Sequence, residues 1–439
     1  MRLRASEIAA AVGGTLHGRD TEVDGAGIDS RRLRRGELFI PVVGRRDGHD
    51  YIPDALAAGA PAYLTARPSR GGTAVVTDDT ITALNTLARW ARRRLPDRVA
   101  AVTGSVGKTT TKDLLAAALR RCLLVGASPH SFNNELGVPL SLLAVPAGAE
   151  AVVLEMGTGG AGEIARHCEL AKPSAGIVTR VAPAHLEALG DLAGVARAKA
   201  ELVETLPAGG LAVLNGDDPR VAAMRSRTRA AVLSFGRASQ ADVVATAVTV
   251  GDDLRPRFRL CSPWGAADVR LAARGEHQVG NALAAAALAL AWGVPLEEVT
   301  AALELAPLSP GRMQLLRTPS GAMLLDDAYN ASPASMTEAL RSLTRLPAQR
   351  RVAVLGAMAE LGARSDSYHR AVRALALGLG IRVIQVGLGA YGAERVASAE
   401  DAVAALGAIG DGDAVLVKGS RVTGVDRVAR ALLSVQQAS

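Results

Sequence analysis

One strand-to-helix junction constrains this chain more than any other feature of its sequence. Residues 101–110 read Ala-Val-Thr-Gly-Ser-Val-Gly-Lys-Thr-Thr, a β-branched run that breaks into a glycine-containing loop before a helical pattern over residues 112–121. Glycines let backbone N–H groups close on phosphates, a helix N-terminus adds a partial positive charge, and a lysine adds a full one. The junction therefore predicts a phosphate-binding loop, with a nucleoside triphosphate as the first candidate ligand.

The loop is a shortened form of the P-loop pattern G-x-x-x-x-G-K-[ST], which would need glycine where Val102 stands. A short match of this kind is also compatible with an ordinary strand-to-helix turn. The cation usage argues against that alternative, because the chain has 45 arginines and five lysines, at positions 108, 112, 172, 199 and 418. Where arginine is the default cation, Lys108 indicates a role that a guanidinium cannot fill.

The length of 439 residues exceeds what one hydrophobic core usually serves, and we expect three domains. The composition is 49% hydrophobic, 21% charged and only 3% aromatic, which is typical of a globular protein with helices packed on sheets. The predicted domains are residues 1–96, 97–307 and 308–439.

Charge and cysteine usage exclude several classes of protein. The net charge of +7 comes from scattered arginines rather than from a basic tract with interleaved aromatics, so we expect no nucleic-acid partner. Cys122, Cys168 and Cys261 have neither disulfide-framework nor zinc-site spacing. No export signal is visible, and the longest apolar stretch, residues 282–296, falls short of the roughly 20 residues that span a bilayer. These features predict a cytoplasmic protein without membrane insertion.

Hydrophobic patterning predicts an α/β fold throughout. The first domain mixes short strands and helices and ends in a basic helix, residues 82–95, before Pro96. In the second, β-branched runs alternate with helical patterns, which predicts a parallel sheet; residues 242–273 instead suggest a small antiparallel insertion before a helix near Gln278. The third repeats the alternation and predicts a Rossmann-like doubly wound sheet. The predicted strands are residues 99–103, 151–156, 175–179, 211–215 and 231–235, then 322–326, 351–356, 382–386 and 414–417.

Two polar residues follow strands of the central domain. Glu155 closes a buried strand, where a carboxylate needs a partner such as the magnesium of a nucleotide, although an N-cap or a surface ion pair is the alternative. His185 follows the next strand and is a candidate metal ligand, with simple hydrogen bonding equally compatible. Lys199 lies among small residues on a predicted helix; it is either a surface lysine or a buried amine that could take up CO₂ and become a carbamate ligand for Mg²⁺.

Further candidates lie around the second domain boundary. His277 and Asn281 stand one helical turn apart on an alanine-rich helix, which suits recognition of a planar group such as adenine, or helix capping. Arg312 could reach a phosphate, or be one more surface arginine. Asp326 and Asp327 end a strand, where they suit ribose hydroxyls or magnesium, although paired aspartates also end strands for structural reasons.

Taken together, four motifs resemble the Mur ligase family of ATP-dependent amide-forming enzymes. They are residues 104–109, 132–140, 326–330 and 418–421. Within the family they are most similar to members that join D-alanyl-D-alanine to UDP-N-acetylmuramoyl-tripeptide. The sibling that adds the third stem amino acid shares the pattern Asp29-Ser30-Arg31 but typically has a threonine-rich motif in place of Asn133-Asn134.

The resemblance implies a first domain for the UDP-sugar peptide, a second for ATP and a third for the dipeptide. It implies two Mg²⁺ ions, one on Thr109 and Glu155 and one on His185 and carbamylated Lys199, with Lys108 completing the catalytic set. Implied ATP contacts are Gly104, Ser105, Val106, Gly107, Lys108, Thr109, Thr110, His277, Asn281, Arg312 for phosphate and Asp327 for ribose. Implied substrate contacts are Ser30, Arg31, Asn133, Asn134, Tyr329 and Asn330.

Three positions depart from the family pattern: Arg180 and Gln278 each replace an asparagine, and Ser332 replaces the second Asn of Asn-Ala-Asn.

The implied reaction is phosphorylation of the tripeptide carboxylate by ATP, followed by attack of the dipeptide amine, by a monomeric enzyme. Two alternatives remain: a related amide ligase, either diamino-acid-adding or a folate polyglutamate synthase, or a P-loop protein that binds a nucleotide as a switch.

Overall fold

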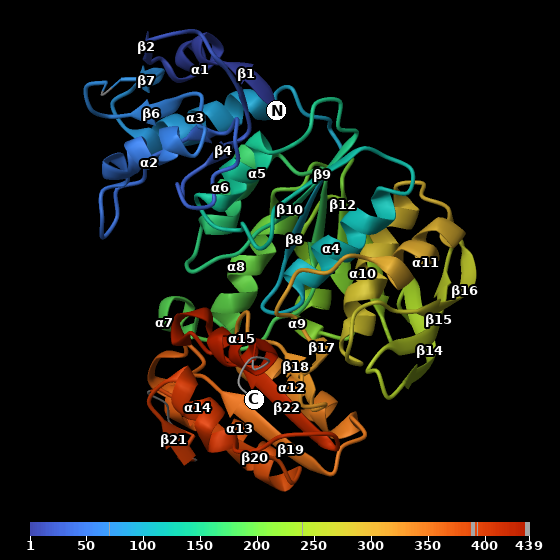
Figure 1. Cartoon of the computed structure of the whole chain (residues 1–439). Coiled ribbons are helices and arrows are strands. Elements are labelled where there is room, and N and C mark those ends of the chain that lie inside the picture. Colours follow the sequence, from blue (N-terminus) through green and yellow to red (C-terminus); the bar gives the residue numbers. More distant parts are fainter. Residues whose placement is uncertain (70, 239, 388–390, 393, 435–439) are drawn as a thin grey trace.

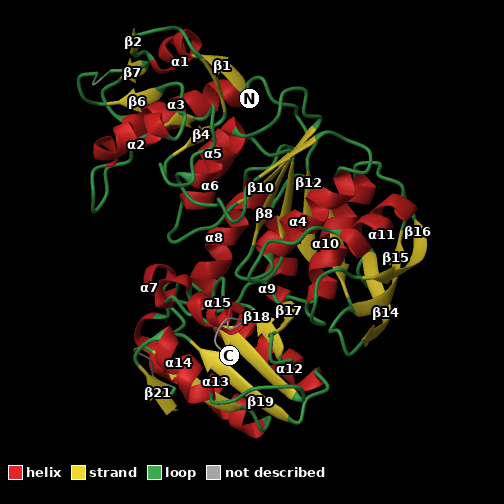
Figure 2. Cartoon of the chain, in the orientation of Figure 1, coloured by secondary structure: helices red, strands yellow, loops and turns green. Residues whose placement is uncertain are grey.

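The computed structural model describes residues 1–69, 71–238, 240–387, 391–392 and 394–434. Its sheets follow one another along the chain, and Figure 1 shows the first and third groups of elements at opposite ends of the second. Figure 2 shows helices against the faces of the sheets in all three groups. Among the described residues, no helix combines the length and apolar character that a membrane span requires.

The first group holds two small sheets and a closing helix. β1 (Arg2–Arg4) pairs with β3 (Glu22–Asp24), and a second sheet has the strand order β2-β7-β6-β5-β4. The closing helix α3 spans Thr80–Arg92 rather than the predicted 82–95, because the Asp79 side chain accepts a hydrogen bond from the Thr82 N–H at 2.7 Å and starts the helix there. The other elements are α1 (Ala5–Val12), β2 (Thr15–His17), β4 (Ala26–Gly27), β5 (Leu38–Phe39), α2 (Ile52–Ala57), β6 (Tyr63–Thr65) and β7 (Ala74–Val76).

The second group is built on one long sheet of order β16-β15-β14-β13-β12-β11-β8-β10-β9. From β9 to β14 neighbouring strands are parallel, as predicted, and β14 to β16 are antiparallel. The antiparallel segment is therefore an extension of the main sheet rather than a separate insertion, because β13 pairs with β14. The strands are β8 (Val99–Thr103), β9 (Val125–Ala127), β10 (Ala151–Glu155), β11 (Ala175–Val178), β12 (Leu211–Asn215), β13 (Ala231–Gly236), β14 (Val243–Val250), β15 (Pro256–Ser262) and β16 (Gly265–Arg270).

Helices cover both faces of this sheet and create two separate cores. On one face α4 (Lys108–Leu119), α10 (Gln278–Ala291) and α11 (Leu296–Leu305) pack together. On the other lie α5 (Gly137–Leu143), α6 (Glu163–Ala171) and α8 (Leu192–Glu204). The near-continuous burial of β8, β10 and β11 follows from this double cover. Two short helices, α7 (Leu186–Leu189) and α9 (Pro219–Ala222), complete the group.

The helix after the phosphate loop begins at Lys108, four residues earlier than predicted. Gly107 stands before it with φ +87°, a left-handed conformation that glycine adopts without strain. The run Lys-Thr-Thr-Thr lacks an apolar period, so the sequence pattern hid the first turn. This earlier start places the side chains of Lys108 and Thr109 at the positive end of α4.

The third group forms a sheet of order β17-β18-β22-β19-β20-β21. β18 to β21 run parallel along the sheet, and the unpredicted edge strand β17 is antiparallel to β18. One face packs on α12 (Pro333–Arg345) and α13 (Ser365–Gly378), the other on α14 (Ala399–Leu406) and α15 (Asp426–Ser434), so the sheet is doubly wound as expected. The strands are β17 (Gln314–Arg317), β18 (Met323–Asp326), β19 (Arg350–Leu355), β20 (Arg382–Val386), β21 (Glu394–Val396) and β22 (Asp413–Lys418).

Candidate active site

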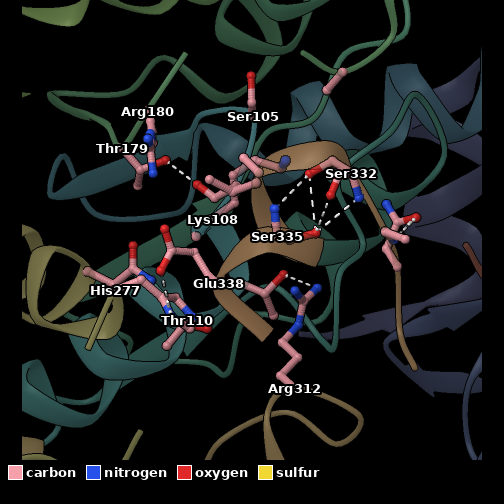
Figure 3. A pocket seen from close by; sticks show the side chains of 18 of the residues that line it. Ser105, Lys108, Thr110, Thr179, Arg180, His277, Arg312, Ser332, Ser335 and Glu338 are labelled. Carbon is pink, nitrogen blue, oxygen red and sulfur yellow. Dashed lines mark hydrogen bonds and ion pairs between the residues drawn. The ribbon is translucent and has the colours of Figure 1, made fainter. Parts of the chain in front are cut away.

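A cavity of about 860 Å³ lies where the second and third groups of elements meet. One wall is formed by the loop before α4 together with the first turn of α4. Residues at the carboxyl ends of β18 and β22 contribute another wall. Figure 3 shows Lys108, Arg180, His277 and Arg312 around this space, together with Glu338 from α12. Residues from distant parts of the chain therefore share one site.

The phosphate loop is closely packed against its surroundings. Lys108 Nζ donates to the Gly104 carbonyl oxygen at 2.8 Å, which holds the amine over the loop. A Cβ on Gly104 (φ +148°) would collide with Thr179 Oγ1, and one on Gly107 with Asn281 Oδ1. Burial lowers the pKa of Lys108, while the nearby Glu155 carboxylate opposes this effect. The loop thus presents backbone amides and one cation to a ligand, which fits a phosphate chain.

Thr109 is the centre of a polar cluster. Its hydroxyl donates to Glu155 Oε2 at 2.7 Å and accepts from Arg312 Nη2 at 2.7 Å. Asn133 Nδ2 donates to the other carboxylate oxygen of Glu155 at 2.6 Å. The hydroxyl and carboxylate of the predicted magnesium pair are therefore adjacent. Within the described ranges no cluster of three or more His, Cys, Asp or Glu residues could hold a metal by itself, so an ion here would need phosphate oxygens or water as well.

Lys199 and His185 lie near enough to Lys108 for its charge to act on both. Lys199, on α8, is 1% exposed, and burial together with the charge of Lys108 brings its pKa well below the usual value. Among the described residues, none forms a hydrogen bond or an ion pair with the Lys199 amine. His185 places Nδ1 against the Glu360 carboxylate from the third group, and burial lowers its pKa as well. The surface reading of Lys199 is thus wrong, and a buried, unpaired amine fits carbamate formation.

His277 and Asn281 both face the cavity. His277 is the residue preceding α10; its Nδ1 lies 4.0 Å from Glu338 Oε2 and has no hydrogen-bond partner among the described residues. Burial lowers the pKa of His277. Asn281 Nδ2 donates to Gln278 Oε1 at 2.6 Å, so these two polar side chains orient each other. An unpaired ring nitrogen beside an amide suits a ligand with hydrogen-bonding edges.

The third group contributes a cation held over an aromatic ring and a buried ion pair. The Arg312 guanidinium carbon lies 4.3 Å from the centre of the Tyr329 ring. Lys418 Nζ donates to Asp327 Oδ2 at 2.5 Å and to the Asn330 carbonyl oxygen at 2.9 Å. Asp327 Oδ1 also accepts from the Met313 N–H at 3.1 Å. Asp327 therefore fixes the strand-end loops as well as facing the cavity, and all six of these residues line it.

Three predicted substrate residues do not line this cavity. Ser30 and Arg31 belong to the first group, on the turn after β4, where Arg31 makes a two-pronged ion pair with Asp29 at 2.8 Å. Asn134 accepts from the Gly137 N–H at 2.9 Å through Oδ1 and so supports the start of α5. Asn133, its neighbour, does reach the cavity.

The three departures from the family motifs have local roles. The Arg180 carbonyl accepts from the Ser105 N–H at 2.7 Å while its side chain lines the cavity. Gln278 orients Asn281, as described above. The Ser332 hydroxyl accepts from the Ser335 N–H at 3.4 Å and caps α12.

Comparison with known proteins identifies the family. The Mur ligase family catalytic domain matches residues 22–104, the Mur ligase middle domain matches 102–289, and the Mur ligase glutamate ligase domain matches 311–421. The UDP-N-acetylmuramoyl-tripeptide--D-alanyl-D-alanine ligase of Escherichia coli (strain K12) is 37% identical over 451 residues, which cover 97% of each chain. This chain belongs to the Mur ligase family.

Solved structures of other Mur ligases have the same architecture. A crystal structure of MurF from Acinetobacter baumannii aligns with a TM-score of 0.85 at 30% identity, covering 99% of both chains. That of the Thermotoga maritima MurF ligase in complex with ADP aligns with a TM-score of 0.80 at 28% identity, covering 93% of this chain and 97% of the other. The predicted family and fold class are thereby confirmed.

In this Mur ligase the cavity also holds charged residues that the sequence did not single out. Glu276 Oε1 accepts from Arg237 at 2.6 Å and Oε2 from Arg345 at 2.5 Å, which links α12 to the second group. Glu338 and Glu360 face the two histidines. Glu338 and Arg345 lie on the amphipathic helix α12, where spaced charges look like an ordinary solvated face, so no sequence signal distinguished these two.

Proposed function

We propose that this Mur ligase joins D-alanyl-D-alanine to UDP-N-acetylmuramoyl-tripeptide at the expense of ATP, in the cytoplasm and as a monomer. The observation that carries the proposal is the meeting of Lys108, Thr109, Glu155 and Arg312 at one cavity in a chain similar over its full length to a ligase of that name. The product would be the pentapeptide precursor of peptidoglycan.

Amide formation needs an activated carboxylate, because a free carboxylate is a poor electrophile in water. In the proposed route the γ-phosphoryl group of ATP passes to the terminal carboxylate of the tripeptide. The dipeptide amine then attacks the acyl carbon, a C–N bond forms, the C–O bond to phosphate breaks, and the amine loses a proton. Phosphoryl transfer depends mainly on positioning and charge neutralisation, so no side-chain nucleophile is required.

The residues of the cavity suit these tasks. Lys108 and the amides of residues 104–110 would hold the β- and γ-phosphates, and Arg312 would approach the same phosphates from the third group. His277 and Asn281 would contact adenine, and Asp327 the ribose. Asn133, Tyr329 and Asn330 line the same cavity and would contact the acceptor substrates.

The oxygen donors at the loop fit a magnesium ion. Thr109 and Glu155 would hold one Mg²⁺, which neutralises phosphate charge when bound. His185 and carbamylated Lys199 would hold a second. Because Nδ1 of His185 faces Glu360, ligation would fall to Nε2, with the carboxylate orienting the ring.

The three groups of elements would divide the work. We propose that residues 1–96 bind the UDP-sugar end, with Ser30 and Arg31 among the contacts. Residues 97–307 would bind ATP, and residues 308–439 the dipeptide. This division places the two acceptor-binding parts on either side of the nucleotide loop, consistent with the arrangement in Figure 1.

An ADP-release assay across acceptors tests the proposal. Purified protein with Mg·ATP and UDP-N-acetylmuramoyl-tripeptide should release ADP only when D-alanyl-D-alanine is added, and mass spectrometry should detect the pentapeptide product. Turnover with a diamino acid and the dipeptide form of the nucleotide substrate would instead identify the sibling ligase. Hydrolysis independent of any acceptor would favour a nucleotide switch and overturn the proposal.

A further inference from the structure

Lys112 is a buried cation outside the cavity that the proposed reaction does not use. It lies on the second turn of α4 with 3% of its surface exposed, and it does not line the cavity. Its Nζ donates to the Ser128 carbonyl oxygen at 2.9 Å and to the His130 carbonyl oxygen at 2.6 Å. Lys112 thereby ties the nucleotide-binding helix to the loop that follows β9.

That loop positions the Asn133 side chain next to Glu155. Ser128 Oγ accepts from the Glu155 N–H at 3.1 Å, and the Asn133 side chain donates to the Glu155 carboxylate. His130 has φ +47°, a conformation that costs free energy for a residue with a Cβ and persists only where its surroundings hold it. The hydrogen bond from Lys112 to the His130 carbonyl is one such restraint. The position of Asn133 thus depends on contacts that Lys112 makes.

Asp113, the next residue, makes the corresponding link to the third group. Its Oδ1 lies 2.9 Å from Lys112 Nζ, and its Oδ2 accepts from the Ser309 N–H at 2.8 Å. Ser309 is three residues before Arg312, whose guanidinium donates to Thr109. Because Asp113 side-chain exposure is only 10%, both of its contacts are shielded from water and from salt.

We propose that the Lys112–Asp113 pair is a positioning unit for the ligation reaction: Lys112 sets the loop that carries Asn133, and Asp113 sets the segment that carries Arg312. Both segments are held by contacts with the same two residues of α4, which lie one turn beyond Lys108 and Thr109. The inference rests on the proposed function for its kinetic consequences, whereas its structural consequence is independent of which acceptor is used.

Lys112→Met is the first variant, because methionine fills similar space and removes the charge and all three donors. The Michaelis constant for UDP-N-acetylmuramoyl-tripeptide should rise about tenfold or more and kcat should fall, while the dissociation constant for ADP stays within about threefold. Lys112→Arg, which keeps the cation and its donors, should recover part of the loss. Lys172→Met, at an exposed lysine after α6, is the matched control and should behave as the parent.

Asp113→Asn is the second variant, and it keeps Lys112 in place. The carboxamide offers one acceptor and one donor group, so it cannot satisfy both the ammonium of Lys112 and the N–H of Ser309. We expect kcat/KM for ATP to fall about tenfold with the Michaelis constant for the tripeptide changing less. If Lys112→Met fails to fold, these kinetic effects of Asp113→Asn still test the proposal.

Hydrogen–deuterium exchange separates failure of this inference from failure of the proposed function. Peptides covering residues 128–136 should exchange faster in Lys112→Met at an unchanged melting temperature, whether or not D-alanyl-D-alanine is the acceptor. Unaltered exchange in that loop, or losses in substrate and ADP binding that are equal and follow a lower melting temperature, would show a merely structural pair and overturn the inference.

Discussion

Arg312 Nη2 donates to Thr109 Oγ1 at 2.7 Å, although 203 residues separate the two in sequence. The contact joins the start of the third group to the first turn of α4. Since Thr109 also donates to Glu155, a single hydroxyl connects a proposed phosphate-binding cation with a proposed metal-binding carboxylate. Changes at either end should therefore alter catalysis more than stability.

Arg312→Ala should reduce kcat/KM for ATP by about 10- to 100-fold, the usual range for a hydrogen bond to a charged group. The melting temperature should change little, because Arg312 covers the cavity rather than a core. Arg317→Ala, five residues later on the exposed side of β17, is the control. Steady-state ADP release measures both, and equal activity of the two variants would remove Arg312 from the site.

Lys108→Ala should abolish dipeptide-dependent ADP release. The substitution removes the cation that stands over the loop, and among the described residues no other lysine bonds to the Gly104 carbonyl oxygen. Binding of ADP, followed by calorimetry, should weaken as well. Activity equal to the parent would contradict the role of this residue, and normal circular dichroism of the variant would show that loss of activity is not loss of fold.

Lys199→Ala should be nearly inactive and should regain part of its activity in a small carboxylate such as formate or acetate. The truncated side chain leaves space, and an added carboxylate can replace the oxygen ligand that a carbamate would supply. Sodium chloride at equal ionic strength is the control for salt, and Lys108→Ala, which lacks a cation instead, should not respond. Absence of rescue at any concentration would count against the carbamate.

His167, on α6, should make stability fall in mild acid. Burial lowers its pKa in the folded chain, so the unfolded chain binds a proton first as the pH falls. The stability that depends on neutral His167 is complete above the unfolded-state pKa of about 6.5. It is lost as the pH falls below that value, with a slope of at most about 1.4 kcal/mol per pH unit. His167→Phe should flatten the curve of unfolding free energy between about pH 6.5 and 5. His185 and His277 also have lowered pKa values, so the difference from the parent, with exposed His17→Phe as control, isolates this residue.

The cysteines should differ sharply toward alkylation. Burial raises the pKa of Cys168 to about 12, so the thiolate is scarce at neutral pH, whereas Cys122 is exposed. Iodoacetamide at pH 8 should label Cys122 and leave Cys168 unmodified until guanidinium unfolds the chain. Peptide mass spectrometry reads the two sites separately. Rapid labelling of Cys168 in the folded protein would show that α6 is not packed as described.

The sequence by itself determined the elements and the kind of chemistry. Alternating β-branched and helical runs predicted the parallel sheets, and the loop before Lys108 predicted a phosphate site, because local propensity and glycine conformation depend on neighbours in the chain. Its predictions of individual roles rested on motifs, and several polar residues kept a structural alternative. Asn134 was an implied substrate contact only through the family resemblance, and in the structure its side chain accepts a hydrogen bond from the N–H of Gly137 at the start of α5.

Only the tertiary structure decided which of these residues meet. Burial of Lys199, the contact of His185 with Glu360, and the links from Lys112 and Asp113 to distant loops depend on packing between segments far apart in sequence. A lone lysine on a helix has the same sequence pattern whether it faces water or a core. Its surroundings, and hence its charge state and chemistry, are fixed by the elements that fold over it.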